Sequence, residues 1–283
     1  MNMLTPTPAL LAFILVFAGL FGLVVGSFLN VVVYRVPAGI PLTRDSQCPN
    51  CDAPVRAWQN VPVLSWLVLR GRCARCAAPI SARYPLVELA TGIAFVAIAG
   101  MVLGAGGVLA DAGDPAVWLV LVAFLYLAAI SIALTLIDLD VRRLPNSIVL
   151  PSYLVAIVLI GAAGVIAGDW AGLLRAGIGM AALYLFYALL RFIRPAGMGG
   201  GDVKLAGLLG IYLGWLGWPV LVVGAFAAFV LGGVFGIVLM LTRRAGRRTA
   251  IPFGPWMLAG AWVGILAGSA LGDWYLGLLH VGS

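Results

Sequence analysis

Two aspartates stand at the edges of long apolar segments, where ionisable side chains are rare. Asp138 directly follows the apolar run 117–137, and Asp202 lies shortly before the apolar run 205–218. A charged side chain at the edge of a membrane span is costly, so such a residue is a candidate functional group by default. Two carboxylates at comparable positions therefore predict a cooperating pair.

The chemistry available to such a pair is aspartyl proteolysis. Two carboxylates within hydrogen-bonding distance cannot both be ionised cheaply, so they share a proton. The ionised carboxylate can then take a proton from water while the protonated one polarises a peptide carbonyl. The glycine-rich residues 197–201 suit a backbone that bends beside Asp202 and admits an extended substrate strand. We therefore place Gly199, Gly201 and Lys204 in the predicted active-site loop.

Each aspartate also has a purely structural interpretation. Asp138 could be a solvated helix-end charge beside Asp140, and Asp202 could pair with Lys204. The shared side of the membrane and the glycines before Asp202 favour the functional interpretation. Asp140 ranks second for the role of Asp138, because two residues further along a helix it points to a different face. Glu88 is the third intramembrane candidate, with a salt bridge to an arginine as its structural alternative.

Composition places the chain in a membrane. Of 283 residues, 63% are hydrophobic and only 10% are charged, with a mean hydropathy of +1.12, which no soluble domain of this size shows. Glu88, Lys204 and His280 are the only glutamate, lysine and histidine. Sites with several histidine ligands are therefore excluded, and a histidine base is disfavoured. The net charge of +7 comes from arginines, whose distribution concerns membrane topology rather than nucleic acid.

Apolar stretches of roughly 20 residues are long enough to cross a bilayer. We predict eight spans, at 8–33, 86–109, 116–137, 147–167, 171–191, 203–218, 220–241 and 255–275. The first apolar run lacks the basic n-region of a cleavable signal, so we expect it to be a span. The expected fold class is an all-α polytopic membrane protein.

The basic residues test this topology. With the N-terminus outside, the inside segments are 34–85, 138–146, 192–202 and 242–254. Together with the flanking Arg191 and Lys204 they carry 16 of the 17 basic residues, and Arg175 is the exception. The outside loops hold Asp111, Asp114, Asp169 and Asp273. This pattern follows the positive-inside rule for both termini outside, and it puts Asp138 and Asp202 on the same, cytoplasmic side.

All four cysteines lie in the one sizeable extramembrane segment, 34–85. They form two Cys-x-x-Cys knuckles, Cys48 with Cys51 and Cys73 with Cys76, separated by 21 residues. Two such knuckles can bring four thiolates into a tetrahedron around a zinc ion, as in a zinc ribbon. Because four cysteines leave no open coordination position for a catalytic water, we expect the zinc to be structural. Disulfides are the alternative, and a reducing compartment disfavours them.

The predicted organisation has three parts. A first transmembrane helix occupies 1–33, and a small cytoplasmic zinc-binding domain occupies 34–85. A membrane core with seven spans occupies 86–283.

Further motifs follow one another along the chain. Residues 26–37 read Gly-Ser-Phe-Leu-Asn-Val-Val-Val-Tyr-Arg-Val-Pro, and Asn60-Val-Pro62, Ser65-Trp66, Gly71-Arg-Cys73 and Arg83-Tyr-Pro-Leu-Val-Glu-Leu89 come next. Residues 137–140 read Ile-Asp-Leu-Asp, followed by Leu144-Pro145, Gly199-Gly-Gly-Asp202 and Ile251-Pro-Phe-Gly-Pro255. In this order the set resembles the type IV prepilin peptidases, G-x-G-D membrane aspartyl proteases also called leader peptidases with N-methyltransferase activity. The resemblance covers nearly the whole chain.

The resemblance implies substrates and a location. The substrates would be type IV prepilins and the pseudopilins of type II secretion, cut after a glycine at the cytoplasmic face of the bacterial inner membrane. Both termini would be periplasmic, and the partners would be these substrates and the lipid bilayer, without nucleic acid.

The resemblance also implies site residues and cofactors. Asp138 and Asp202 would be the catalytic pair, and Asn146 departs from the aspartate that many members carry there. S-adenosylmethionine would donate a methyl group to the new N-terminal residue of the cleaved substrate. The resemblance assigns this methyl transfer to the 34–89 region, where Gly71, Arg83 and Glu88 are our candidate site residues.

Three alternatives to the activity that the resemblance implies remain open. A small proton-coupled carrier would also contain intramembrane acids and broken helices, although no inverted repeat is visible. A catalytically inactive assembly scaffold would bind pilins without cutting them. A peptidase that has lost methylation is disfavoured by the four cysteines and by the segment 83–89.

Overall fold

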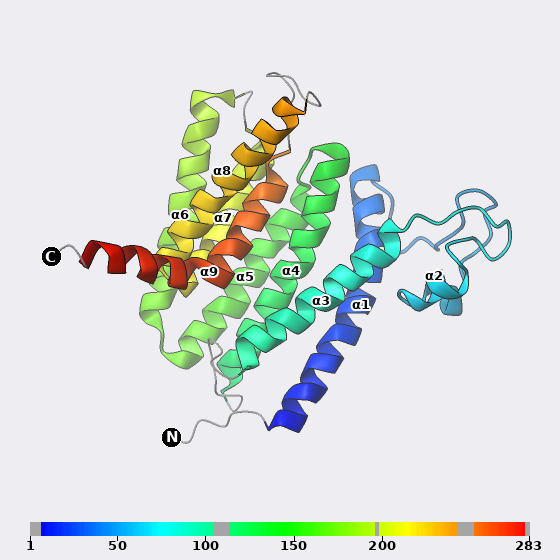
Figure 1. Cartoon of the computed structure of the whole chain (residues 1–283), viewed down its shortest axis with the longest axis horizontal. Coiled ribbons are helices and arrows are strands. Elements are labelled where there is room, and N and C mark those ends of the chain that lie inside the picture. The colour runs from blue at the N-terminus through cyan, green and yellow to red at the C-terminus, as the bar shows by residue number, and fades with distance from the viewer. Residues whose placement is uncertain (1–6, 105–113, 196–197, 243–251, 281–283) are drawn as a thin grey trace. The chain divides into compact units, whose positions relative to one another are not determined.

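The structure, a computed structural model, describes residues 7–104, 114–195, 198–242 and 252–280 (Figure 1). Some residues used above lie outside this described part, namely Asp111, Gly197, Arg243, Arg244, Arg247, Arg248 and Ile251. Within the described part, a helix occupies each of the eight predicted positions, and β-structure is limited to two isolated bridges. The predicted all-α fold class is confirmed.

The long helices are α1 (Pro8–Ala38), α3 (Arg83–Leu103), α4 (Pro115–Val141), α5 (Asn146–Ala167), α6 (Trp170–Ile193), α7 (Gly200–Leu216), α8 (Trp218–Leu241) and α9 (Gly254–His280). Two short helical elements, η1 (Ala57–Asn60) and α2 (Leu64–Val68), lie between α1 and α3. The sequence analysis did not predict these short elements, because four or five residues show no hydrophobic periodicity.

Seven of the described helices are long and apolar enough to cross a membrane, and α7 is not among them. Its 17 residues span about 26 Å, slightly less than the hydrocarbon core of a bilayer. Most of its residues from Val203 to Trp215 are buried, and it contacts α5, α6, α8 and α9. The sixth predicted span is therefore a short helix enclosed by its neighbours.

Several helix ends differ from the predicted spans, and α9, for example, continues to His280 where the prediction ended at residue 275. Helix α4 continues to Val141, so Asp138 lies inside its last turns rather than after it. Helix α1 continues past Pro37 until Gly39, whose left-handed conformation (φ +68°) ends it. Helix α3 ends at Leu103 with Gly104 as its cap, and residues 105–109 of the predicted span lie outside the described part.

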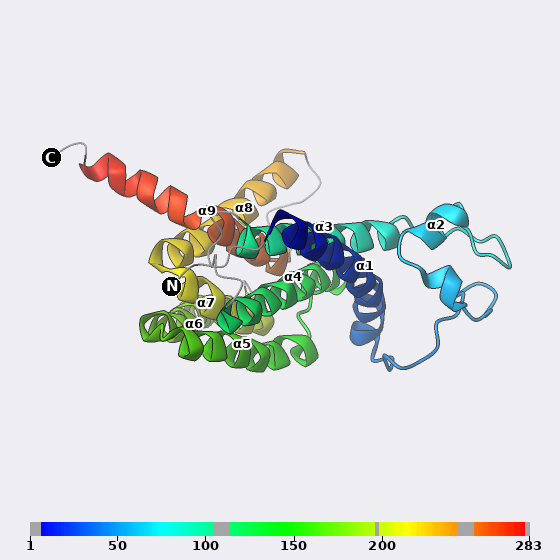
Figure 2. The same ribbon diagram turned by 90° about the horizontal axis from the view of Figure 1, so that it is seen from below.

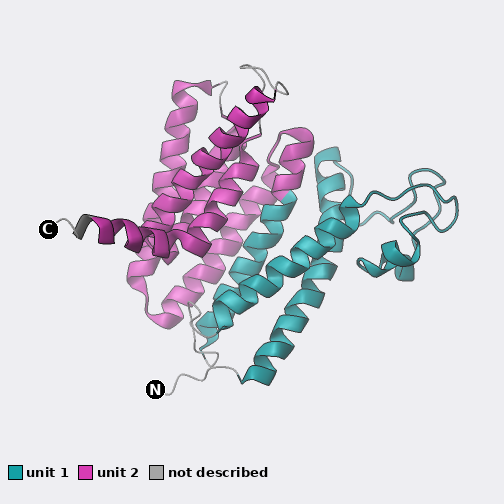
Figure 3. Ribbon diagram, in the orientation of Figure 1, with its two compact units in different colours: residues 1–133 teal, residues 134–283 magenta. Residues whose placement is uncertain are grey.

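The helices group into two compact units, residues 1–133 and 134–283 (Figure 3). In the first unit α1 and α3 lie side by side (Figures 1 and 2). A Cβ atom at Gly22 would lie 2.8 Å from the Gly92 Cα, and one at Gly26 would lie 2.7 Å from the Glu88 Cα. Small residues allow the close backbone contact that stabilises helix pairs in membranes.

Glycines also bring the helices of the second unit together. Helix α6 packs on α7 where Gly179 lies against Gly210 and Gly214, and α8 packs on α9 where Gly224 lies against Gly264. A Cβ at Gly179 would lie 2.5 Å from the Gly210 carbonyl oxygen. Close packing around α7 therefore depends on the absence of side chains at these positions.

We predict that Gly179→Ala lowers the stability of the protein by about 1–3 kcal/mol, because the added methyl group must push α6 away from α7. Gly177→Ala, on the same helix, is the matched control, since a Cβ there has no atom within 4 Å. Thermal unfolding in detergent measures the difference. Equal melting temperatures for the two variants would show that the α6–α7 contact tolerates a side chain.

Candidate functional site

Asp138 is a buried carboxylate in the last turns of α4, with only 5% of its surface exposed. Its Oδ2 accepts a hydrogen bond of 3.1 Å from the N–H of Gly254. Gly254 is the first residue of α9, so this N–H belongs to the donors that a helix start leaves free. A Cβ at position 254 would lie 2.7 Å from Asp138 Oδ2, so the α9 backbone approaches the carboxylate this closely because the residue is glycine.

Asp202 occupies the first turn of α7 and is partly buried. Its Oδ2 accepts a hydrogen bond of 2.9 Å from the N–H of Gly199, which satisfies a donor at the start of the helix. The Asp202 carboxylate is within electrostatic range of Asp138 and of Tyr187. Among the described residues, Oδ1 of each aspartate has no such donor, so one oxygen of each carboxylate is available for a proton or a water molecule.

Leu144 packs between the two segments that hold the carboxylates. A Cβ at Gly201 would lie 2.8 Å from the Leu144 Cβ, and a Cβ at Gly254 would lie 3.3 Å from the Leu144 Cδ2. A Cβ at Gly200 would likewise collide with the Arg191 guanidinium. Gly199, Gly200 and Gly201 are not among the residues with positive φ. Gly200 and Gly201 therefore provide space for close packing, while Gly197 of the predicted bend lies outside the described residues.

Lys204 and Asp140 lie beside the pair but face elsewhere. The Lys204 ammonium donates a hydrogen bond of 2.9 Å to Asn146 Oδ1, at the start of α5. The carbonyl of Lys204 accepts a hydrogen bond of 2.5 Å from the Tyr153 hydroxyl, also on α5. Lys204 therefore ties the Asp202 end of α7 to α5. Asp140 lies on an exposed face of α4, as its spacing from Asp138 predicts.

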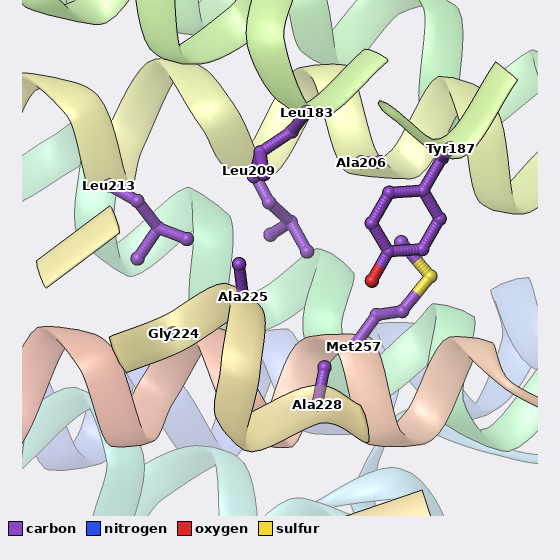
Figure 4. Close-up of a pocket in the computed structure, with 9 residues that line it drawn as sticks. All are labelled: Leu183, Tyr187, Ala206, Leu209, Leu213, Gly224, Ala225, Ala228 and Met257. Carbon is purple, nitrogen blue, oxygen red and sulfur yellow. The ribbon is translucent and has the colours of Figure 1, made fainter. Parts of the chain in front are cut away.

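A small apolar cavity lies among α6, α7, α8 and α9. Its lining residues are Leu183, Tyr187, Ala206, Leu209, Leu213, Gly224, Ala225, Ala228 and Met257. Tyr187 and Met257 point into the same space from opposite sides (Figure 4).

Tyr187 also belongs to an aromatic cluster with Phe229 and Phe253, whose ring centroids lie 5.3–6.2 Å apart. Phe253 directly precedes Gly254, so this cluster reaches the residue that holds Asp138. Sequence reasoning missed Tyr187, because no motif marks it. Phe253 could have been found within the motif 251–255.

The two cysteine knuckles repeat the same turn. In each, the N–H of the first cysteine donates to the carbonyl five residues later, at 2.9 Å for Cys48 and 2.8 Å for Cys73. The residue four positions after that cysteine has a positive φ, 52° for Asp52 and 58° for Ala77. This repetition turns both pairs of thiols towards one point.

The four sulfur atoms lie within 4.8 Å of one another, and Cys48 Sγ lies 3.8 Å from Cys76 Sγ. A tetrahedral zinc ion with Zn–S bonds of about 2.3 Å needs sulfur atoms about 3.8 Å apart. All four cysteines are free thiols. The cluster has the geometry and the donor set to hold a metal ion.

Backbone hydrogen bonds favour the thiolate form that binds metals. Those from Cys76 and Arg75 lower the pKa of Cys73 to about 6, and one from Ala78 lowers the pKa of Cys76. Despite a hydrogen bond from the Ala53 backbone, burial and the neighbouring thiols raise the pKa of Cys51 to about 11. A bound cation would overcome that rise, because coordination deprotonates a thiol.

The predicted methyl-transfer candidates have defined places in the first unit. Glu88 is buried in α3, and its Oε2 accepts a hydrogen bond of 2.7 Å from the Val63 N–H. Gly71 has φ +66°, and a Cβ there would lie 2.8 Å from the Trp66 ring. Arg83 is the first residue of α3. Glu88 and Gly71 therefore shape the segment between α1 and α3.

Arg35, in the motif 26–37, is buried and holds the start of the same segment. Its guanidinium donates hydrogen bonds to the carbonyls of Pro41 and Leu42 and to the Ser46 hydroxyl, at 3.3, 2.9 and 3.3 Å. The carbonyl of Arg44 also accepts from this guanidinium. The arginine of the first motif therefore fixes the path of the chain towards Cys48.

Comparisons with known proteins cover most of the chain. Residues 20–102 match the bacterial peptidase A24 N-terminal domain, and residues 123–237 match the type IV leader peptidase family. Proteins named prepilin leader peptidase/N-methyltransferase from Stutzerimonas stutzeri and Aeromonas hydrophila are each 38% identical to the chain, over 94% of both sequences. One with the same name from Neisseria gonorrhoeae is 37% identical, over 87% of the chain and 88% of its own length. No solved structure matches the chain significantly.

For the cysteine cluster, we predict that Cys73→Ser combined with Cys76→Ser abolishes metal binding, because two ligands cannot hold a structural ion. Elemental analysis of the purified protein measures metal per chain, and limited proteolysis between α1 and α3 should become faster. Ala74→Ser is the control, since this exposed residue lies between the two cysteines. Unchanged metal content in the double variant would mean that the metal binds elsewhere.

Proposed function

The chain belongs to the type IV leader peptidase family, and from this premise we propose that Asp138 and Asp202 form its peptidase centre. The protein is a membrane peptidase that removes the leader peptides of prepilins and methylates the N-terminus that cleavage exposes. The observation that supports the assignment is that the carboxylates at the end of α4 and at the start of α7 are within electrostatic range of each other, and that each has one oxygen bonded to a glycine N–H. Among the described residues no donor occupies the other oxygen of either carboxylate, and we propose that these oxygens carry out the chemistry.

In the proposed reaction a water molecule lies between the two free Oδ1 atoms. The ionised carboxylate accepts a proton from this water as its oxygen attacks the scissile carbonyl carbon, while the protonated carboxylate donates a proton to the carbonyl oxygen. The resulting gem-diol intermediate collapses when the C–N bond breaks: the carboxyl group that took the proton from water gives it to the leaving amine, and a hydroxyl of the intermediate gives its proton to the other carboxylate. The two carboxylates then again share a single proton.

The proposed substrates are type IV prepilins and the pseudopilins of type II secretion. The apolar helices make the protein a multi-pass membrane protein, and we place it in the bacterial inner membrane with both termini in the periplasm. The positive-inside pattern supports this orientation, which puts Asp138 and Asp202 at the cytoplasmic face.

The segment between α1 and α3 is the proposed site of methyl transfer. Zinc is the proposed ion for Cys48, Cys51, Cys73 and Cys76, where it would have a structural role. S-adenosylmethionine supplies the methyl group when bound, and Arg83 remains our candidate for contacting it. Glu88 and Gly71 would act by holding Val63 and Trp66 in place. The division into 1–33, 34–85 and 86–283 remains part of this proposal.

Asp138→Asn and Asp202→Asn test the peptidase assignment directly, because each keeps the side-chain shape and removes the shareable proton. We expect each to reduce prepilin cleavage by about 10²–10⁴-fold, the usual contribution of general acid–base catalysis. Mass spectrometry of a prepilin incubated with S-adenosylmethionine reports leader loss and the added methyl group together.

Asp140→Asn is the matched control and should cleave normally. Cleavage that survives in either of the other two variants would remove that aspartate from the mechanism. An uncut prepilin with the unaltered protein would favour the carrier or the scaffold.

Gly254→Ala should impair cleavage without removing a carboxylate. Its methyl group would displace Asp138 Oδ2 and weaken a hydrogen bond to a charged group, worth about 1.5–3 kcal/mol, so we expect a loss of roughly 10–100-fold. The same cleavage assay measures it. Gly233→Ala on α8 is the control, because a Cβ there has no atom within 4 Å. Full activity of Gly254→Ala would show that the hydrogen bond from residue 254 does not position Asp138.

A further inference from the structure

The segment between α1 and α3 exposes an apolar surface, which we call the Trp58 surface. Its members are Trp58 in η1 and Leu64, Leu67 and Val68 in α2, which are 52%, 61%, 58% and 73% exposed. The other side of α2 faces the segment, where the Trp66 indole N–H donates a hydrogen bond of 3.1 Å to the Ile80 carbonyl. With Val61, which is 41% exposed, five large apolar side chains are exposed within the 11 consecutive residues 58–68, and exposed apolar side chains that gather in this way mark an interaction site.

Basic residues flank this surface on both sides along the chain. Residues 53–87 contain five arginines and neither aspartate nor glutamate. Of these arginines, Arg56, Arg70 and Arg72 are exposed and flank the Trp58 surface along the chain. An apolar centre with a basic rim complements a bilayer interface that contains anionic lipids.

Two contacts set the depth of the Trp58 surface relative to the ends of α1 and α3. The Asn30 side chain on α1 donates a hydrogen bond of 3.1 Å to the Tyr84 carbonyl on α3, so these two positions lie at one level. Tyr84 is exposed at this level and Tyr34 is exposed about one turn further along α1, and exposed tyrosines at helix ends are typical of the membrane interface. Glu88 lies four residues further along α3, which is about 6 Å deeper.

Glu88 holds α2 at that depth. Its carboxylate bonds to the N–H of Val63, the residue that directly precedes α2. Val63 has φ +61°, a conformation that β-branched residues rarely adopt, so this hydrogen bond helps to hold an unfavourable turn. Figure 1 shows α2 to the side of α1 and α3, below the C-terminal end of α1 in that view. The first residues of α2 are therefore level with the beginning of the α3 span rather than beyond it.

We propose that the Trp58 surface inserts into the cytoplasmic leaflet, at the boundary between lipid headgroups and acyl chains. Arg56, Arg70 and Arg72 contact the anionic headgroups around it. This attachment rests on the proposed orientation of the spans but not on the catalytic role of any residue. It holds the metal-binding segment against the membrane at a third place, besides its connections to α1 and α3.

The test uses the full chain with a photo-crosslinking amino acid at position 67 or 68, in bilayers with about 30% phosphatidylglycerol. We expect lipid adducts at both positions, at least about fivefold more abundant than with the same group at position 74, an exposed position in the second knuckle. Equal lipid adducts at all three positions would overturn the proposal. Adducts to another copy of the chain, or to an added prepilin, would assign the surface to a protein partner and would also overturn it.

The charged rim has its own measurement. The double variant Arg70→Gln, Arg72→Gln should lower the share of phosphatidylglycerol among the lipid adducts at position 67 by at least about half. About 1 M salt should have the same effect on the unaltered chain, because it screens exposed charges. If the adducts already match the bulk lipid composition in the unaltered chain, the arginines do not select anionic lipid. Prepilin cleavage by the crosslinker variants shows separately whether the peptidase assignment holds.

Discussion

A carboxylate buried near the membrane needs a hydrogen-bond donor, because water is scarce there and an unpartnered charge is very costly. This chain supplies that donor from its backbone. Gly254 donates to Asp138 at the start of α9, and Gly199 donates to Asp202 at the start of α7. Helix starts have N–H groups to spare, so this arrangement satisfies the carboxylate and the helix end together. Within the described part of the chain it holds each carboxylate by a single oxygen, and the proposed mechanism uses the other for proton transfer.

The packing of the second unit follows from that requirement. Backbone donors reach a carboxylate only if no side chain intervenes, and the positions beside the carboxylates are glycines for this reason. Leu144 fills the space between Gly201 and Gly254, so one apolar side chain sets the spacing of the segments on both sides. Further from the pair, Gly179, Gly210 and Gly214 let α7 lie close to α6, so that a helix of 17 residues is enclosed by protein.

The first unit uses its buried charges in a comparable way, with side chains that bind backbone. Arg35 donates to the carbonyls that follow α1, and Glu88 accepts from the N–H of Val63. These two residues hold both approaches to a segment that is too small to bury a large core. The cysteine cluster adds a third point of attachment within that segment, because a metal ion there would join both knuckles. In this unit the buried charges of Arg35 and Glu88 therefore fix the backbone of the segment between α1 and α3.

The sequence by itself determined the fold class, the positions of the long helices, the grouping of the four cysteines and the choice of Asp138 and Asp202 as candidates. Those features depend on local hydrophobicity and on short motifs, which one stretch of chain displays unaided. Only the tertiary structure decided that Gly254 donates to Asp138, 116 residues away, and that Glu88 binds Val63. It also decided that Gly200 and Gly201 provide space for Arg191 and Leu144. These facts depend on which surfaces meet, and spacing along a single chain does not encode which backbone donor reaches which carboxylate.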